Sequence, residues 1–172
     1  MRKQKGFSLI ELLIVVAIIL IIAAIAIPNL MKSKAAANEA GGAATTRTLI
    51  TDAITYSNSF PAEGYPLNIT RLGAVAQPCV PSINGACLAD NVLACAAPPC
   101  IKDNYSYTLT GINGGAAPQT DFVVFGTPAG DSAGHTDYCS SSDGVPRRQL
   151  TPGAAPTAAI TVVSTCTALT PL

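Results

Sequence analysis

The feature that most constrains this sequence is a long apolar stretch close to its N-terminus. Residues 7–27 contain a single ionisable side chain, Glu11, and no polar residue occurs between Leu12 and Ile27. As a helix rising about 1.5 Å per residue, this stretch reaches about 30 Å, the thickness of the hydrocarbon core of a bilayer. We therefore predict one membrane-spanning helix. The basic residues at its start, Arg2, Lys3 and Lys5, predict that the N-terminus stays in the cytoplasm.

The small residue that could mark a processing site lies before the apolar stretch. A secretory signal peptide is cut after its apolar region, at small residues. Here the small residue is Gly6, which precedes that region. Cleavage after Gly6 would remove residues 1–6 as a leader and leave the whole apolar helix on the mature chain, with a free amine on Phe7.

Glu11 is an ionisable side chain within an apolar span, where it costs about 2.5 to 3.5 kcal/mol on insertion scales. Two interpretations follow. In the first, the Phe7 amine of a neighbouring subunit pairs with Glu11 and sets the axial stagger between subunits. In the second, Glu11 lies near the membrane surface, reaches water and has no specific partner.

Residues 5–28 resemble the N-terminus of type IV pilins and the related pseudopilins. The resemblance rests on the run Gly6-Phe7-Ser8-Leu9-Ile10-Glu11-Leu12 and on the apolar stretch that ends at Ile27-Pro28. It implies cleavage after Gly6 by an inner-membrane prepilin peptidase, methylation of the new amine on Phe7, and subunit docking through Glu11. We group Pro28 with Glu11 as an assembly residue.

The resemblance also implies partners and a location. The precursor would sit in the bacterial inner membrane, meet the pilus assembly machinery there, and polymerise with copies of itself into an extracellular pilus. The alternative is a minor pilin, or a pseudopilin of a type II secretion system in a periplasmic pseudopilus. A third class, an enzyme or ligand-binding domain on a membrane tether, would need a cavity with converging polar groups.

The rest of the chain predicts a globular head that uses the second half of the same helix. We expect residues 7–34 to form the hydrophobic assembly helix and residues 35–172 to form the head. Pro28 predicts a kink or a loosened turn, and Gly41-Gly42 predict a bend or local melting. From Ala43 to Tyr56 apolar residues recur at helical spacing, and the helix should end near Ser57 to Phe60, before Pro61.

Strand patterns occur only after Cys100, beyond an irregular region with one short helix expected near Leu88 to Ala94. They predict three or four antiparallel strands that pack on the amphipathic half of the helix, an α+β fold. The expected strands are Tyr105 to Leu109, Phe122 to Phe125, His135 to Ser140 followed by Val145 to Leu150, and Ile160 to Val163.

Six cysteines follow the apolar stretch: Cys79, Cys87, Cys95, Cys100, Cys139 and Cys166. An even number in a small, loop-rich region predicts disulfides in an oxidising compartment. Zinc is disfavoured because the chain has one histidine, His135, and no paired Cys-x-x-Cys. We expect Cys139 to pair with Cys166 and the four earlier cysteines to pair among themselves.

Other chemistry is weakly supported, and we predict neither an enzyme nor a cofactor. His135 and Asp137 lie near Ser132 and Ser140, but a triad is defined by geometry, and no Gly-x-Ser-x-Gly is present. Asp131, Asp137 and Asp143 lack EF-hand spacing. No phosphate-binding Gly-x-x-x-x-Gly-Lys occurs, so a filament motor would be a separate protein.

The charge balance gives no sign of nucleic-acid binding. The ten basic and ten acidic residues cancel, and no basic cluster occurs beyond the N-terminus. Loss of residues 1–6 would leave seven basic residues against ten acidic ones, a formal charge of −3. The mature chain would thus be mildly acidic. The first hypothesis, from the N-terminal resemblance, is a structural filament subunit.

Overall fold

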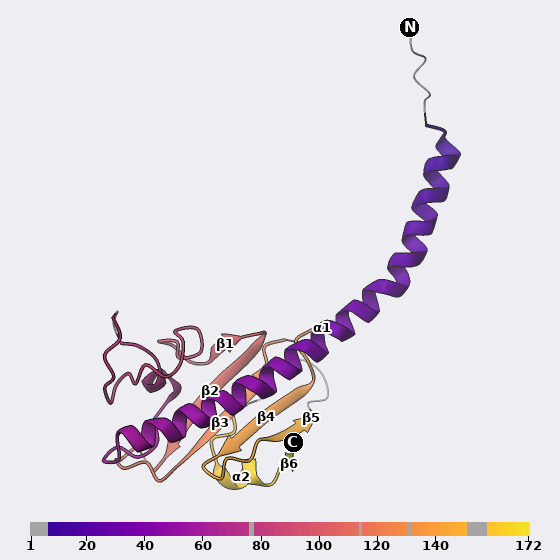
Figure 1. Cartoon of the computed structure of the whole chain (residues 1–172). Coiled ribbons are helices and arrows are strands. Elements are labelled where there is room, and N and C mark those ends of the chain that lie inside the picture. Colours follow the sequence, from indigo (N-terminus) through magenta and orange to yellow (C-terminus); the bar gives the residue numbers. More distant parts are fainter. Residues whose placement is uncertain (1–6, 76–77, 114, 131, 151–157) are drawn as a thin grey trace. The chain divides into compact units, whose positions relative to one another are not determined.

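The computed structural model describes residues 7–75, 78–113, 115–130, 132–150 and 158–172. The chain divides into two compact units, residues 1–34 and residues 35–172. Helix α1 contributes to both units, whereas the sheet and the disulfides belong to the second (Figure 1). The predicted leader, including Gly6, lies outside the described residues.

Helix α1 (Leu9–Ser59) is 51 residues long and ends where the sequence predicts. Pro28 lies inside it, and the helix also continues through Gly41 and Gly42. The predicted melting at these two glycines is wrong for a packing reason. A Cβ on Gly42 would stand 2.9 Å from Cε1 of Tyr105, so the glycine permits the helix to lie directly on the tyrosine ring.

The sheet has six antiparallel strands, and their spatial order follows the chain. Short turns can join antiparallel neighbours, so this meander needs no crossover. The central pair is the longest, with a register from Tyr105 opposite Pro128 to Ile112 opposite Asp121. The strands are β1 (Cys100–Lys102), β2 (Tyr105–Ile112), β3 (Asp121–Pro128), β4 (Thr136–Ser141), β5 (Arg147–Leu150) and β6 (Thr170–Pro171).

The α+β class with a long helix on an antiparallel sheet is confirmed, with corrections in detail. Six strands replace the predicted three or four, because β1 and β6 add three and two residues at the edges. The strand predicted at Ile160 to Val163 is absent from the structure, and helix α2 (Val163–Thr167) begins there instead. The predicted helix at Leu88 to Ala94 is a turn, and a 3-10 helix, η1, covers Ile69–Leu72.

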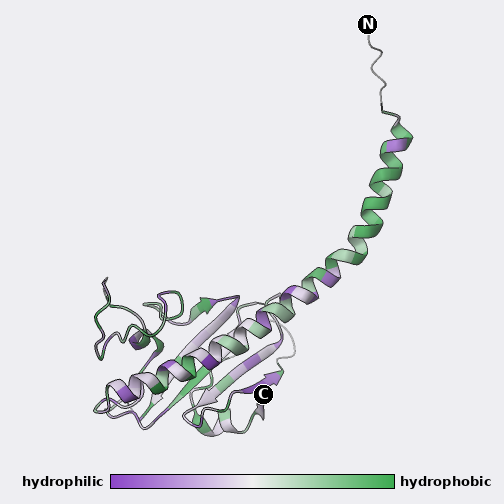
Figure 2. Cartoon of the chain, viewed as in Figure 1, coloured by the Kyte–Doolittle hydropathy of each residue, from purple (hydrophilic) through white to green (hydrophobic). Residues whose placement is uncertain are grey.

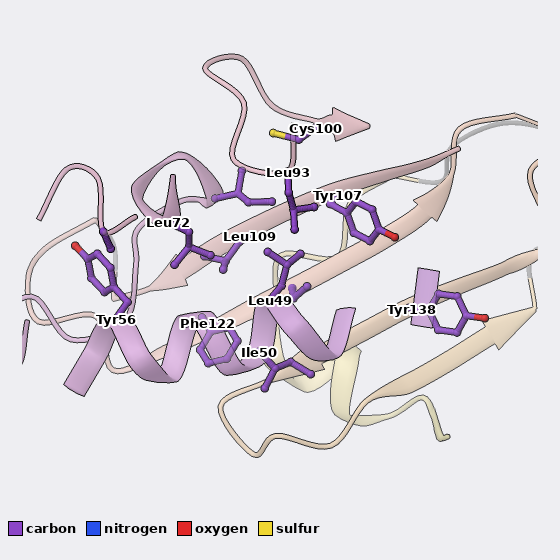
Figure 3. Close-up of a cluster of buried hydrophobic side chains, with 14 of the residues drawn as sticks. Leu49, Ile50, Tyr56, Leu72, Leu93, Cys100, Tyr107, Leu109, Phe122 and Tyr138 are labelled. Carbon is purple, nitrogen blue, oxygen red and sulfur yellow. The ribbon is translucent and has the colours of Figure 1, made fainter. Parts of the chain in front are cut away.

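The main core lies between α1 and one face of the sheet. The helix contributes a stripe at helical spacing, and β2 and β3 contribute alternate residues, as expected when successive side chains point to opposite faces. Figure 3 shows these side chains meeting between the helix and the strands. Its buried members include Leu49, Ile50, Tyr56, Leu72, Tyr105, Tyr107, Leu109, Phe122 and Val124.

A second, smaller core covers the other face of the sheet. Val123 and Phe125 point to this face, where they meet Cys139 and Cys166. The C-terminal segment supplies the cover, through Ile160, Val163 and Leu169. The sheet is therefore buried on both faces, by α1 on one and by the segment around α2 on the other.

Three disulfides join the six cysteines: Cys79–Cys87, Cys95–Cys100 and Cys139–Cys166. The predicted pairing of Cys139 with Cys166 is confirmed, as is pairing among the earlier four. The first two bonds lie in the loop between η1 and β1. The third ties α2 to β4 and closes the longest loop, with a sequence separation of 27.

We expect the Cys139–Cys166 bond to stabilise the head most. Replacing both residues by serine should lower the free energy of unfolding by about 3 kcal/mol or more, because a long loop regains its entropy and the second core loses its tether. The matched double substitution, Cys79→Ser with Cys87→Ser, removes a bond that closes a sequence separation of only 8. It should lower the free energy of unfolding by less. Urea unfolding of a head fragment beginning at residue 35 would measure both. An equal or larger loss for the shorter loop would contradict the expectation.

Candidate assembly helix

The N-terminal half of α1 has an apolar surface that nothing in the described chain covers. The buried residues of α1 begin only at Gly42. Figure 2 shows mostly hydrophobic colouring along the N-terminal half of the helix, with one hydrophilic band near its start, and mixed colouring in the half that belongs to the head. The exposed side chains include Phe7, Leu9, Ile10, Leu12, Leu13, Ile14, Val15, Val16, Ile18, Ile19, Leu20, Ile21, Ile22, Ile25, Ile27, Leu30 and Met31.

A helix that is apolar all round needs an apolar environment on every side. By length and composition α1 can cross a membrane. Outside a membrane, each large side chain left in water would forgo about 1.5 to 3 kcal/mol of burial free energy. The same surface could equally be covered by neighbouring helices of the same kind.

Glu11 makes a local contact that the sequence analysis missed. Its Oε2 accepts a hydrogen bond of 2.9 Å from the backbone N–H of Ser8, directly before the first residue of α1. The N–H of Leu12 in turn donates to the Ser8 carbonyl. Ser8 and Glu11 thus occupy the first and last places of a capping box, in which the glutamate satisfies a backbone donor that the helix cannot. The Ser-x-x-Glu spacing of residues 8–11 is the sequence pattern that could have predicted this contact.

The cap leaves the second carboxylate oxygen of Glu11 available. Oε2 is the atom that accepts from Ser8, and within the described chain Glu11 forms no ion pair. Phe7 is 79% exposed and lies directly before this cap. A cation from outside the chain could therefore approach Glu11 without breaking the cap.

The sequence of this helix matches known proteins. Residues 1–27 match a family described as the prokaryotic N-terminal methylation motif. A stretch of 39 residues is 62% identical to the type IV wide pilus major component PilA4 of Thermus thermophilus. The N-terminus is that of a type IV pilin-like protein. The match covers 23% of this chain and 30% of the relative, and no solved structure matches the chain.

In the head, the residues weighed for catalysis have structural contacts. The backbone N–H of His135 donates to Oε1 of Glu39 on α1, at 2.7 Å. Asp137 is buried in β4 and accepts from Gln149 of β5. The hydroxyl of Ser140 donates to the carbonyl of Val145. These contacts join the start of β4 to α1 and to β5, and the end of β4 to the turn that follows it, whereas Asp131 lies outside the described residues.

Three ion pairs join charged side chains of the described head. Arg71 binds Glu63 at 2.9 Å and also donates to the hydroxyl of Tyr56. Lys102 binds Asp90 at 2.7 Å, and its hydrogen bond holds the pKa of that carboxyl below its usual range. The remaining pair joins Arg147 to Asp143, whose pKa is lowered in the same way.

Asp52 on α1 lies in a different environment. It is partly buried, and its Oδ2 is fully buried without a hydrogen-bond partner among the described residues. Burial disfavours the charged form and raises the pKa of Asp52 from an ordinary 3.8 to about 6. No cation contributes to this shift.

Asp52 should therefore make head stability fall as the pH rises. The pKa of Asp52 is higher in the fold than in the unfolded chain. Below about pH 4 the side chain is neutral in both states, so its burial carries no charge penalty. The free energy of unfolding then falls as the pH rises through about 6, because the buried side chain must ionise. Discounted for solvent exposure, the penalty at neutral pH is about 1 kcal/mol.

Asp52→Asn should remove this penalty. We expect the variant to be more stable by about 1 kcal/mol at pH 7 and to show a flatter stability profile between pH 4 and 7. Urea unfolding of the head fragment at several pH values is the measurement. Asp103→Asn is the matched control, since Asp103 is exposed and should change neither quantity. A less stable Asp52→Asn head at pH 7 would refute the assignment.

Proposed function

We propose that this chain is the structural subunit of an extracellular type IV pilus. The precursor lies in the inner membrane with residues 1–6 in the cytoplasm, and prepilin peptidase cuts after Gly6 and methylates Phe7. The pilus assembly machinery then transfers the mature subunit into a helical homopolymer.

The observation that carries this proposal is the uncovered apolar surface of α1 between Leu9 and Met31. A subunit that leaves the membrane must replace lipid around this surface with something equally apolar. Summed over so many side chains, exposure to water would cost tens of kcal/mol, at about 1.5 to 3 kcal/mol each. Copies of the same helix, packed side by side in a filament core, meet this need. The Thermus relative, a major component of a type IV wide pilus, supports the same assembly.

Glu11 then has a defined task in the filament core. A carboxylate enclosed by apolar helices is costly unless a cation joins it. Cleavage creates one such cation, the amine of Phe7, on every subunit. Because Phe7 and Glu11 are four residues apart, the pair would form between helices shifted by about 6 Å or somewhat more along their axes.

The test is an intact-mass measurement on filaments sheared from the cells. We expect abundant filaments whose subunit lacks residues 1–6 and carries one methyl group on Phe7. Subunits of the processed mass that stay in the cell envelope would point to the periplasmic pseudopilus of a type II secretion system. An unprocessed mass would contradict both assignments.

A further inference from the structure

The head exposes two arginines that no carboxylate of the described chain neutralises. Five basic side chains belong to residues 35–172, and three of them form the ion pairs given above. The remaining two, Arg47 on α1 and Arg148 on β5, are both exposed and form no ion pair with a described residue. They are far apart in the sequence, yet the fold brings both to the same tyrosine.

The two arginines lie near the hydroxyl of Tyr138. Arg148 is directly opposite Tyr138 in the β4–β5 register, so both side chains are on the face of the sheet that α1 covers. Burial and the Glu39 carboxylate raise the pKa of Tyr138, whereas nearby Arg148 and Arg47 lower it. Glu39 accepts from the backbone N–H of His135 and pairs with neither arginine. In Figure 3 the hydroxyl of Tyr138 points away from the other labelled side chains. Two guanidinium groups therefore border one exposed position, which suits an anion.

The head also exposes one carboxylate without a partner. Among the described acidic residues of the head, only Asp103 is both exposed and without a hydrogen bond or ion pair. Asp103 and Asn104 form the two-residue turn between β1 and β2, where Lys102 is opposite Tyr105. Their φ angles are 52° and 60°, and a type I′ hairpin turn requires two such positive values. This tight turn holds the carboxylate at a defined place on the surface.

Helix α1 lies on the sheet with a defined side facing it. Gly42 rests on the ring of Tyr105 in β2, and a Cβ on Gly126 in β3 would lie 3.4 Å from the hydroxyl of Thr46, one turn after Gly42. Gly42 and Thr46 thus mark the line along which the helix meets the sheet. A residue one position before or after this line points about 100° to one flank or the other.

Asp103 and the two arginines lie on opposite flanks of α1. Gly41, one position before the line, lies beside Asp103. Arg47, one position after it, points to the flank that holds β4 and β5. The sheet separates the groups as well, because Arg148 is on β5, three strands from β2, or about 14 Å. With the helix between them, Asp103 cannot reach the arginines of its own head.

We propose that Arg47 and Arg148 of one subunit bind the Asp103 carboxylate of a second copy of this chain. The inference rests on the proposed function, because it requires many copies in one assembly, and all three side chains belong to the head. The two surfaces differ, so each subunit uses one flank of α1 toward one neighbour and the other flank toward the next. A heterologous contact of this kind builds rings or open filaments rather than closed pairs.

An exchange of charges in the full-length chain tests the contact. Asp103→Arg alone and Arg148→Asp alone each place like charges together and should lower the yield of sheared filaments about tenfold or more. The double variant restores opposite charges and should recover most of the wild-type yield. Asn91→Arg is the matched control, because it adds an exposed arginine elsewhere in the head and should leave the yield unchanged.

The contact is refuted if either single variant assembles normally. A low yield from Arg148→Asp with a normal yield from Asp103→Arg would show that the arginines bind a different anion. The contact is also refuted if the double variant assembles as poorly as the single ones while immunoblots show normal amounts of subunit in the membrane.

Cross-linking of filaments that keep the charged residues provides the second measurement. Asn104→Cys with Leu150→Cys places one thiol beside Asp103 and another beside Arg148, since Leu150 is two residues further along β5 on the same face and is 76% exposed. The native cysteines are all in disulfides, so a short bismaleimide joins only the new thiols. We expect a ladder of covalently joined subunits on a denaturing gel, and monomers from either single variant.

The contact and the proposed function fail separately in this experiment. Filaments of the double cysteine variant that yield only monomers, or dimers without longer products, would overturn the heterologous contact and leave the filament assignment intact. Absence of filaments from the wild type would refute both.

Discussion

Replacing Gly6 by leucine should leave the chain uncut in the membrane. A small residue at the junction between a basic leader and an intact apolar helix suits a peptidase that works on the cytoplasmic side. A bulky side chain at this position should exclude the bond from that enzyme. The precursor would then keep residues 1–6, and we expect no filaments, because the Phe7 amine needed to neutralise Glu11 would never form.

Immunoblots of membranes with an antibody to the head would show the larger precursor, and intact mass would confirm the retained leader. Gly6→Ala is the matched control, since it keeps a small residue and should still be processed to a large extent. Because the head is built from residues 35–172, its disulfides should be unaffected in both variants. Normal processing of Gly6→Leu would exclude cleavage at this position.

The structure was predicted best from the sequence where a local physical constraint determines it. The apolar run defines the first half of α1 without reference to the head, and Pro61 defines where the helix must stop. The pairing of Cys139 with Cys166 was also accessible, because the four earlier cysteines lie close together and leave these two for each other.

The sequence-based prediction of secondary structure failed where tertiary contacts determine the conformation of the backbone. The β-branched run from Ile160 to Val163 reads as a strand, yet its apolar side chains cover the far face of β3 and β4, and a helical turn brings Cys166 to Cys139. Strands β1 and β6 are too short to show any periodicity. In the turn after Asp90, the aspartate accepts hydrogen bonds from the N–H groups of Val92 and Leu93, as it would at the start of a helix, but no helix follows.

At the N-terminal helix, what sequence reasoning missed is the capping contact of Glu11. The sequence analysis assigned Glu11 a charged partner on another subunit or none, whereas the hydrogen bond from Ser8 lies within the same helical turn. This contact means that substitution of Glu11 by an apolar residue removes a helix cap as well as a charge, so a single variant cannot separate capping from the proposed docking.

Glu11→Leu should give a processed, membrane-resident subunit that builds few or no filaments. The apolar core would lose the carboxylate that selects one stagger between subunits, and every Phe7 amine would be enclosed without a partner. The head should be unaffected, because Glu11 lies about 45 Å along the helix from the head residues near Ala43. Unchanged thermal unfolding of the head, measured beside filament yield, would show that the defect is in assembly.

Glu11→Gln separates docking from capping. Glutamine also serves as the last residue of a capping box, so the Ser8 contact is kept. Its side chain carries no charge, however, and cannot form an ion pair with an amine. If docking depends on charge, we expect Glu11→Gln to assemble as poorly as Glu11→Leu. If Glu11→Gln instead builds filaments in normal numbers while Glu11→Leu does not, the cap is the essential contact, and the glutamate acts by ordering the start of α1. Normal filaments from both variants would leave Glu11 with no role in assembly.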